Sequence, residues 1–562
     1  MKKNLFYALL ASVVVFTTSC GNLKPLSQNN FKATPSPMET VGNDVPVTVN
    51  GTFPEKWFKK KATVKVTPVL KYSGKEAYAT AQNFQGEKVA GNAIEVPYKR
   101  GANFNMSFNF PFQDEMLNSE LYLRFDGKVK SKQAKLPDVK VADGIIATSA
   151  LANAQSTSPS VADDGFQRII KEVQDANIHF VIQQANLRSS ELNKDDVNAW
   201  KKRIEEAFND PKQNLDIEVS AYASPDGGLS LNERLAENRE RNTTKYVESE
   251  LKKRNITSDV NAKYTAQDWD GFRQLLEASN LQDKDLVLRV LSMYPDPETR
   301  EREIKNISAV YSDLAETILP QLRRSRLIAN IEIVGKSDDE IMEFWRNDPK
   351  ELSPEELLYA TTLTDNENDI EKIYQYVTVN FPQDYRGWNN LGTAYYKRGD
   401  FDAAKQAIER AATVAPEAAE VNVNKALFLL MDGDTNSAKA LLGKASEANN
   451  LDAAMGLLNI MEGDYNQAAD ALKDVQSNNA AIAQILTSNY VGAENILKSL
   501  KNPDAMTYYL LAVVGSRTNN FNEVLSNLRS AVSMDSGLVT RALNDLEFAK
   551  YKTNADFTSI LR

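Results

Sequence analysis

The sequence has one cysteine and one histidine in 562 residues, and this scarcity limits its chemistry. The cysteine is Cys20 and the histidine is His179. One thiol and one imidazole are too few for Ser-His-Asp or Cys-His nucleophilic systems and for the usual zinc sites. No Gly-x-x-x-x-Gly-Lys-Ser/Thr or Gly-x-Gly-x-x-Gly segment indicates nucleotide use. We therefore predict no catalytic residue, no metal and no cofactor, and we expect His179 to be a structural residue of a strand.

An excess of basic charge is also missing. The chain has 66 Lys and Arg against 76 Asp and Glu, a net charge of −10. A balance this acidic argues against DNA, RNA or anionic headgroups as principal partners. Hydrophobic residues make up 42% of the chain and charged residues 25%, which is ordinary globular usage. The length exceeds one comfortable core, so about three domains are expected.

Residues 1–20 have the three-part layout of a secretory signal. Two lysines precede an apolar run, 5–16, that is too short to span a bilayer as a stable helix, and small residues lead to Cys20. The pattern resembles a bacterial lipoprotein signal, although Thr17 stands where Leu is usual, and it implies lipidation of Cys20. An ordinary signal peptide with an incidental Cys is the alternative. Without Asp after Cys20, or the acidic cluster of surface-exported Bacteroides-group lipoproteins, we expect the outer membrane, facing the periplasm.

Two contrasting segments follow the signal. Residues 21–45 are rich in Asn, Ser, Pro and Lys, and are expected to form a flexible tether. Between 46 and 150, apolar and polar residues alternate, as in 103–110, with Gly-containing turns between the runs, so we predict a small antiparallel β-sandwich. Asn and Ser alternating with Phe could instead form a carbohydrate-facing sheet, but a core face opposite a solvated face explains the same pattern. A linker of small polar residues is expected at 151–165.

The next region alternates between strand and helix patterns. Strands are expected at 178–183, 215–222, 260–264 and 328–334, with helices at 197–208 and 229–253. The turn Ala-Tyr-Ala-Ser-Pro-Asp-Gly at 221–227 precedes a helix that carries Asn232 and Arg239 at helical spacing. This arrangement resembles the peptidoglycan-binding domain of OmpA-like proteins. The resemblance implies a βαβ domain over 166–337 with a helical insertion at about 265–325.

The same resemblance implies a binding site for a wall peptide. In the family, the helix Arg binds the carboxylate of diaminopimelate and an Asp of the turn binds its ammonium. Arg239 keeps the first role, whereas Ser224 replaces the Asp, with Asp226 two residues on and Asn232 near the ligand's backbone. Loss of one charge-assisted hydrogen bond, worth roughly 1.5–3 kcal/mol, costs on the order of tenfold to a hundredfold in affinity. The alternative role for Arg239 is a surface ion pair with a glutamate of its own helix, Glu233 or Glu237.

Residues 350–550 read as helical, with a repeat of about 34 residues. One copy resembles the tetratricopeptide repeat position by position. The matching residues are Trp388, Leu391, Gly392, Tyr395, Ala404, Ile408, Ala411 and Pro416. Looser copies follow, for example at Gly433-Asp434 and Gly463-Asp464. The resemblance implies four to six helical hairpins stacked into a superhelix, whose concave face binds extended peptides or partner proteins.

These features predict a multidomain α+β protein with an N-terminal β-sandwich, an OmpA-like domain and a C-terminal tetratricopeptide superhelix. Our first hypothesis is a non-enzymatic outer-membrane lipoprotein that associates with peptidoglycan and scaffolds envelope proteins through its repeats. The alternative keeps the lipid anchor and the domains but drops wall binding, leaving a scaffold for secretion or surface-structure assembly. A third class, an envelope enzyme with paired carboxylates, has no pair that the sequence singles out.

Overall fold

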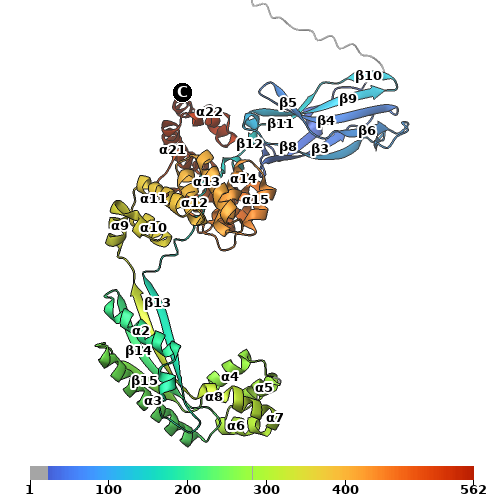
Figure 1. Cartoon of the computed structure of the whole chain (residues 1–562). Helices are drawn as coiled ribbons and strands as arrows, with labels where there is room; N and C mark the ends of the chain where they lie inside the picture. Colours follow the sequence, from blue (N-terminus) through green and yellow to red (C-terminus); the bar gives the residue numbers. More distant parts are fainter. Residues whose placement is uncertain (1–22, 282) are drawn as a thin grey trace, which may run out of the picture. The chain divides into compact units, whose positions relative to one another are not determined.

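The computed structural model describes residues 23–281 and 283–562. The chain forms two compact units (Figure 1). Unit 1 combines the residues up to Asp164 with Thr364–Arg562, and unit 2 is Gly165–Leu363. Unit 2 is therefore inserted in the sequence between two segments that fold together.

The N-terminal part of unit 1 is a β domain. Its strands are β1 (Phe31–Thr34), β2 (Met38–Glu39), β3 (Asp44–Phe53), β4 (Ala62–Tyr72), β5 (Lys75–Tyr78), β6 (Gln82–Gly86), β7 (Ile94–Val96), β8 (Ala102–Pro111), β9 (Ser119–Val129), β10 (Lys132–Lys135), β11 (Val139–Asp143) and β12 (Ile145–Ile146). One sheet has the order β1-β3-β8, and a second follows β10-β9-β4-β6-β7, with β11 on β9 and β5 on β4. The short strands β2 and β12 form a separate parallel pair. Alternate residues of both sheets share one apolar core, which includes Val47, Val66, Phe104 and Leu123.

The expected tether, 21–45, is largely part of this domain instead. The side chains of Leu23, Phe31 and Met38 are buried in the β-domain core. β1 pairs antiparallel with β3, and the indole N–H of Trp57 donates to the carbonyl of Lys24 at 2.7 Å. The Asn, Ser and Pro content led us to expect a coil, whereas a few apolar anchors at strand spacing are enough to bind the segment to the sheet.

Unit 2 contains a four-stranded sheet with the order β13-β16-β14-β15. β13 (Ile169–His179) and β14 (Gln213–Tyr222) both pair antiparallel with β16 (Arg324–Val334), and β15 (Val260–Thr265) lies parallel to β14. α2 (Asp195–Asn209) and α3 (Leu229–Lys253) bury Trp200, Ile204 and Val247 against Ile217, Val219 and Leu327 of the sheet. A short α1 (Ser189–Leu192) precedes α2.

A separate helical subdomain interrupts unit 2 between β15 and β16. It consists of α4 (Trp269–Ala278), α5 (Lys284–Met293), α6 (Pro297–Asn306), α7 (Ser308–Thr317) and α8 (Leu319–Leu322). Phe272, Leu276, Leu314 and Leu322 belong to its own apolar core. The segment that the sequence marks as an insertion thus folds around side chains of its own rather than extending the core of the sheet (Figure 1).

The two helices that follow β16 complete unit 2. They are α9 (Asp338–Asn347) and α10 (Pro354–Ala360). The Arg168 guanidinium pairs with Asp338, and the rings of Phe166 and Tyr359 stack with centroids 4.3 Å apart. We expected the repeats to begin near residue 350, but α10 groups with the strands of unit 2 because its aromatic residue packs on the segment that enters β13.

The C-terminal part of unit 1 is helical. Its helices are α11 (Glu367–Asn380), α12 (Tyr385–Lys397), α13 (Phe401–Val414), α14 (Ala419–Met431), α15 (Thr435–Leu442), α16 (Leu451–Glu462), α17 (Tyr465–Ala471), α18 (Asn478–Leu486), α19 (Tyr490–Ser499), α20 (Ala505–Arg517), α21 (Phe521–Met534), α22 (Gly537–Asn544) and α23 (Ala555–Ile560). From α12 to α21, within the described residues, successive helices pack as five hairpins.

One turn chemistry recurs in these hairpins. The residue at the end of the first helix is left-handed at Gly399, Gly433, Gly463, Ser488 and Asn519. The next residue is always Asp or Asn. The side chains of Asp400 and Asp434, for example, accept hydrogen bonds from the backbone N–H of Ala403 and Ser437. Gly and Asp therefore recur here as helix ends and caps.

Candidate functional site

The four residues predicted to bind a wall peptide lie together in unit 2. Ser224 and Asp226 belong to the turn after β14, and Asn232 and Arg239 lie on α3 directly beyond it. All four line one recess, whose volume is ≈ 40 Å³. The recess is small, with room for about three water molecules.

The Arg239 side chain is buried and bound to main-chain carbonyls. Only 1% of the residue is exposed. Its Nε donates to the carbonyl of Gln184 at 3.0 Å and its Nη1 to that of Tyr222 at 2.8 Å, and the guanidinium lies 4.9 Å from the Phe180 ring centroid. Burial and the nearby Arg323 lower the pKa of Arg239 to about 10, so it remains charged at neutral pH. Its donors hold the loop after β13 against the end of β14.

The alternative surface role predicted for Arg239 is wrong. Glu237, one of the two glutamates proposed as its partner, instead pairs with Arg241 at 2.9 Å. The sequence spacing of Arg239 and Glu237 allowed the pair, but residue 239 faces the sheet, like Ala236 and Thr243, which are both fully buried.

Asp226 has a cationic partner that the sequence did not reveal. Arg323 Nη2 donates to Asp226 Oδ2 at 3.0 Å, and Arg323 Nε donates to Ser224 Oγ at 3.2 Å. The Ser224 hydroxyl in turn donates to the Asp226 carboxylate. Arg323 is 91 residues from Asn232 in sequence and lies directly before β16, so only the fold brings it to the turn. The carboxylate is thereby neutralised within unit 2.

Asn232 closes the turn from the other side. Its amide donates to the carbonyls of Ser224 at 3.0 Å and Gly227 at 2.8 Å. The predicted site residues are thus brought together, but each is hydrogen-bonded within unit 2. In this conformation the recess offers neither a free carboxylate for an ammonium nor a free guanidinium for a carboxylate.

Cys20 lies outside the described residues. His179 ends β13, where burial lowers the pKa of its imidazole despite Glu191 at 3.5 Å. Within 23–281 and 283–562, no cluster of three His, Cys, Asp or Glu side chains is arranged to hold a metal ion. No helix in the described part of the chain is both long enough and apolar enough to cross a membrane.

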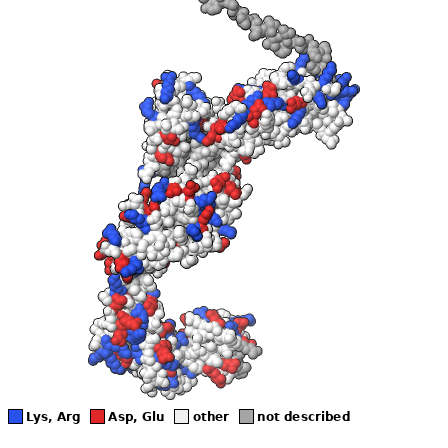
Figure 2. Space-filling model, turned by 45° about the horizontal axis from the view of Figure 1, so that its top comes forward, with Lys and Arg blue, Asp and Glu red and all other residues white. Residues whose placement is uncertain are grey.

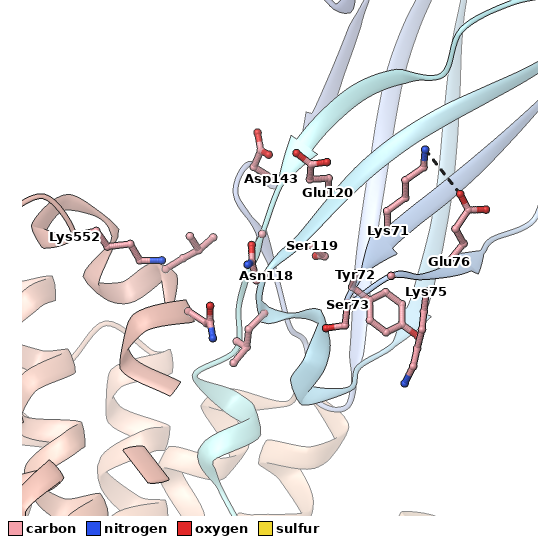
Figure 3. A pocket seen from close by; sticks show the side chains of 15 residues that line it. Lys71, Tyr72, Ser73, Lys75, Glu76, Asn118, Ser119, Glu120, Asp143 and Lys552 are labelled. Carbon is pink, nitrogen blue, oxygen red and sulfur yellow. Dashed lines mark ion pairs between the residues drawn. The ribbon is translucent and has the colours of Figure 1, made fainter. Parts of the chain in front are cut away.

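Figure 3 shows a polar recess of unit 1, ≈ 480 Å³ in volume, between the β domain and the C-terminal helices. Lys71 and Glu76 face each other on the neighbouring strands β4 and β5 and pair at 3.8 Å, while Glu120 and Asp143 both pair with Lys140. On the face drawn in Figure 2, acidic and basic side chains are likewise interspersed. The three carboxylates that line the recess, Glu76, Glu120 and Asp143, are therefore each paired with a cation.

The residues of the repeat signature hold α12 and α13 together. Leu391, Ala404, Ile408 and Ala411 are buried between the helices. A Cβ on Gly392 would lie 2.7 Å from the Ile408 side chain, which explains the need for Gly at this position. Trp388, Leu391 and Tyr395 line a shallow depression of ≈ 640 Å³ beside α13, and Pro416 follows the end of that helix.

A different polar surface lies on the first helices of the hairpins. We call it the asparagine face, and it consists of Asn389, Asn390, Asn424, Asn450 and Asn479. Residues 151–164, which we call the docked segment, lie along it. We expected these residues to be a linker between domains. Instead Ala154, Ser160 and Ala162 are at most 4% exposed, because small side chains let the chain approach the helices closely.

Three asparagines hold the docked segment by its main chain. Asn424 Oδ1 accepts from the N–H of Ser160 and its Nδ2 donates to the carbonyl of the same residue, both at 2.7 Å. Asn390 holds Ala162 in the same way, at 2.7 and 2.9 Å. Asn479 repeats the pattern on Asn153, at 3.2 and 2.8 Å.

Further contacts extend the interaction at both ends. Arg386 on α12 donates to the carbonyl of Asp164 at 2.7 Å, and Thr148, just before the docked segment, donates to Glu547 at 2.6 Å. As the docked segment runs from residue 151 to residue 164, it passes from the later repeats to the first one, so its direction is opposite to the order of the repeats. The sequence contained a signal for this surface: Asn390 and Asn424 are one repeat length, 34 residues, apart.

Comparison with known proteins identifies the repeats. Residues 385–417, which contain α12 and α13, match the tetratricopeptide repeat family. The C-terminal helical region is therefore a tetratricopeptide-repeat region, as predicted, and repeats of this kind are typical of non-enzymatic protein–protein interaction scaffolds. No curated protein matches the chain.

Several solved structures show weak similarity, and one of them is named a tetratricopeptide repeat protein. A tetratricopeptide repeat protein from Parabacteroides merdae is 12% identical, with a TM-score of 0.27, over 42% of this chain and 93% of that one. The Cut9-Hcn1 complex of APC/C is 14% identical, with a TM-score of 0.30, over 60% of this chain and 76% of that one. The type IV pilus biogenesis factor PilW is 17% identical, with a TM-score of 0.24, over 40% of this chain and 96% of that one. These values are too low to carry a functional argument.

Proposed function

We propose that this chain is a non-enzymatic, lipid-anchored scaffold of the bacterial outer membrane, facing the periplasm, whose repeats hold other envelope proteins. The observation that carries the proposal is the series of five tetratricopeptide-like hairpins from α12 to α21. The lipoprotein-like start of the sequence supports the location, and the pairing of charged groups in both recesses supports the absence of catalysis.

The exposed depression beside α13 is a suitable place to test for a partner. Gln406 is exposed there, and Lys65 is an exposed residue of β4 in the same unit. A photo-crosslinking residue at 406 should join the full-length protein to an envelope protein in cells, and the same residue at 65 should give no such adduct. Equal or absent adducts at both positions would contradict the use of this surface.

Radiolabelled lipid should enter the wild type but not Cys20→Ala, which separates a lipoprotein from an ordinary secreted chain.

Wall association through unit 2 is the second candidate. It is supported by the gathering of Ser224, Asp226, Asn232 and Arg239 around one recess, in a domain that resembles the OmpA-like family. Binding would require Arg323 to leave Asp226. If unit 2 binds the wall, the chain beginning after Cys20 should sediment with insoluble peptidoglycan. Its Asp226→Ala and Arg239→Ala variants should then remain in solution. A wild-type chain that stays in solution would leave the scaffold without wall binding.

A further inference from the structure

We propose that the asparagine face is a receptor for the main chain of an extended peptide, and that the docked segment occupies it in cis. A partner reaches this face only with a segment of small, uncharged side chains that displaces residues 151–164. In the docked segment, Ala154 to Thr157 form a turn, and the residues after it are extended. The inference rests on the proposed scaffold function and deepens it by naming the chemistry of the partner.

Recognition of the main chain is the first support. A carboxamide offers one donor and one acceptor side by side, which matches the C=O and N–H of a single residue in an extended chain. Asn390, Asn424 and Asn479 all use this match, on Ala162, Ser160 and Asn153. Because the amides bind groups that every residue except Pro possesses, this contact alone does not select a sequence.

Selection comes from the space around the segment. Ser160 is fully buried and Ala162 is 3% exposed, whereas Ser158 before them and Asp163 after them are exposed. The Ser160 hydroxyl has no hydrogen-bond partner among the described atoms, so the position selects a small side chain rather than a hydroxyl. A displacing segment therefore needs small residues two apart, and it also has to fit the buried places of Ala154 and Thr157. Only its exposed positions, such as that of Ser158, are free to vary.

The polarity of the surface restricts the partner further. Carboxamides and the Tyr396 hydroxyl, which donates to the carbonyl of Ala154, supply the contacts along the middle of the segment. Burial raises the pKa of Tyr396, so its hydroxyl stays protonated and remains a donor. A buried charge on the partner would have no counter-ion there, which favours Ala, Ser, Pro and Thr over acidic or basic residues.

Occupation in cis makes displacement demanding. The segment is continuous with the β domain through Thr148, so its local concentration at the asparagine face is on the order of millimolar. A free peptide has to exceed this concentration or bind more tightly. The repeats therefore exclude peptides that bind weakly or are present at low concentration, without any change in their own structure.

Thiol labelling tests the proposal in the chain that begins after Cys20. This chain contains no cysteine, so an introduced thiol is the only one present. Ala162→Cys places a thiol at a buried position of the docked segment, and Ser158→Cys places one at an exposed position of the same segment. We expect the thiol at 162 to react at least a hundredfold more slowly than the thiol at 158. Equal rates would overturn the assignment of the segment to the asparagine face.

Addition of a synthetic peptide with the sequence of residues 151–164, up to several millimolar, should speed labelling at 162 by about tenfold. The same peptide with Trp at both positions that correspond to Ser160 and Ala162 should have no effect. No acceleration by the first peptide, or equal acceleration by both, would overturn the proposed recognition, whereas the adduct at Gln406 would still report the scaffold function. A molecular mass of two chains would overturn occupation in cis in favour of exchange between copies.

Discussion

The wall-peptide recess of unit 2 and the asparagine face of unit 1 both present polar side chains expected to bind a peptide, yet they are satisfied in different ways. In unit 2, Arg239 binds carbonyls of its own domain and Arg323 neutralises Asp226. In unit 1, the asparagines bind a stretch of main chain from outside the repeats. Polar groups paired within one packed domain are part of its stability, whereas those paired with a separate segment can change partner.

The largest expected effect is that of Arg239→Ala. It removes the buried donor that binds the carbonyls of Gln184 and Tyr222 and creates a cavity beside Phe180. We expect unit 2 to lose about 3 kcal/mol or more in free energy of unfolding, measured by urea denaturation. Arg241→Ala removes an exposed arginine of the same helix and should cost less than about 1 kcal/mol. Equal losses would contradict the structural role of Arg239.

The next effect is local to the asparagine face. Asn424→Ala removes both hydrogen bonds to Ser160, and at about 1 kcal/mol each the opening of the docked segment should become roughly thirtyfold more frequent. Amide exchange at Ser160 reports this opening. Asn495→Ala changes an exposed asparagine of α19 and should leave that rate unchanged. If both variants exchange alike, Asn424 does not hold the segment.

A smaller effect is expected for Asp226→Asn, which keeps the shape of the side chain but removes its charge from Arg323. We expect a loss of about 1–2 kcal/mol in the stability of unit 2, measured by urea denaturation. Asp270→Asn disrupts an exposed pair with Arg273 and should change stability by less than about 0.5 kcal/mol. A neutral result for Asp226→Asn would mean that the recess is not held closed by this pair.

The smallest effect concerns pH. Burial lowers the pKa of His179, so the folded state binds a proton less readily than the unfolded state. Its contribution to stability is present above the unfolded pKa of about 6.5 and is lost as the pH falls through and below that value. Because the chain has one histidine, the difference between wild type and His179→Gln, measured between pH 8 and pH 5, isolates this contribution. The stability of the wild type minus that of His179→Gln should be larger at pH 8 than at pH 5, and a value that is smaller at pH 8 would contradict the sign.

The sequence predicted what depends on local periodicity. Apolar alternation in β3 and β8 indicated the β domain, and Trp388, Gly392 and Ala404 indicated the first complete repeat, because each acts within one element or one hairpin. Contacts across long separations were not predictable. Arg323 reaches Asp226 only because β16 returns beside β14, and a segment of small polar residues is compatible with both a loose linker and a tightly docked strand.

The measurement that tests the central claim most directly is hydrogen exchange on the wild-type chain beginning after Cys20, followed amide by amide. We predict that the N–H groups of Asn153, Ser160 and Ala162, which donate to asparagine side chains, exchange at least a hundredfold more slowly than those of an unstructured peptide. Exchange of all three at the rate of an unstructured peptide would contradict the docking of this segment on the repeats.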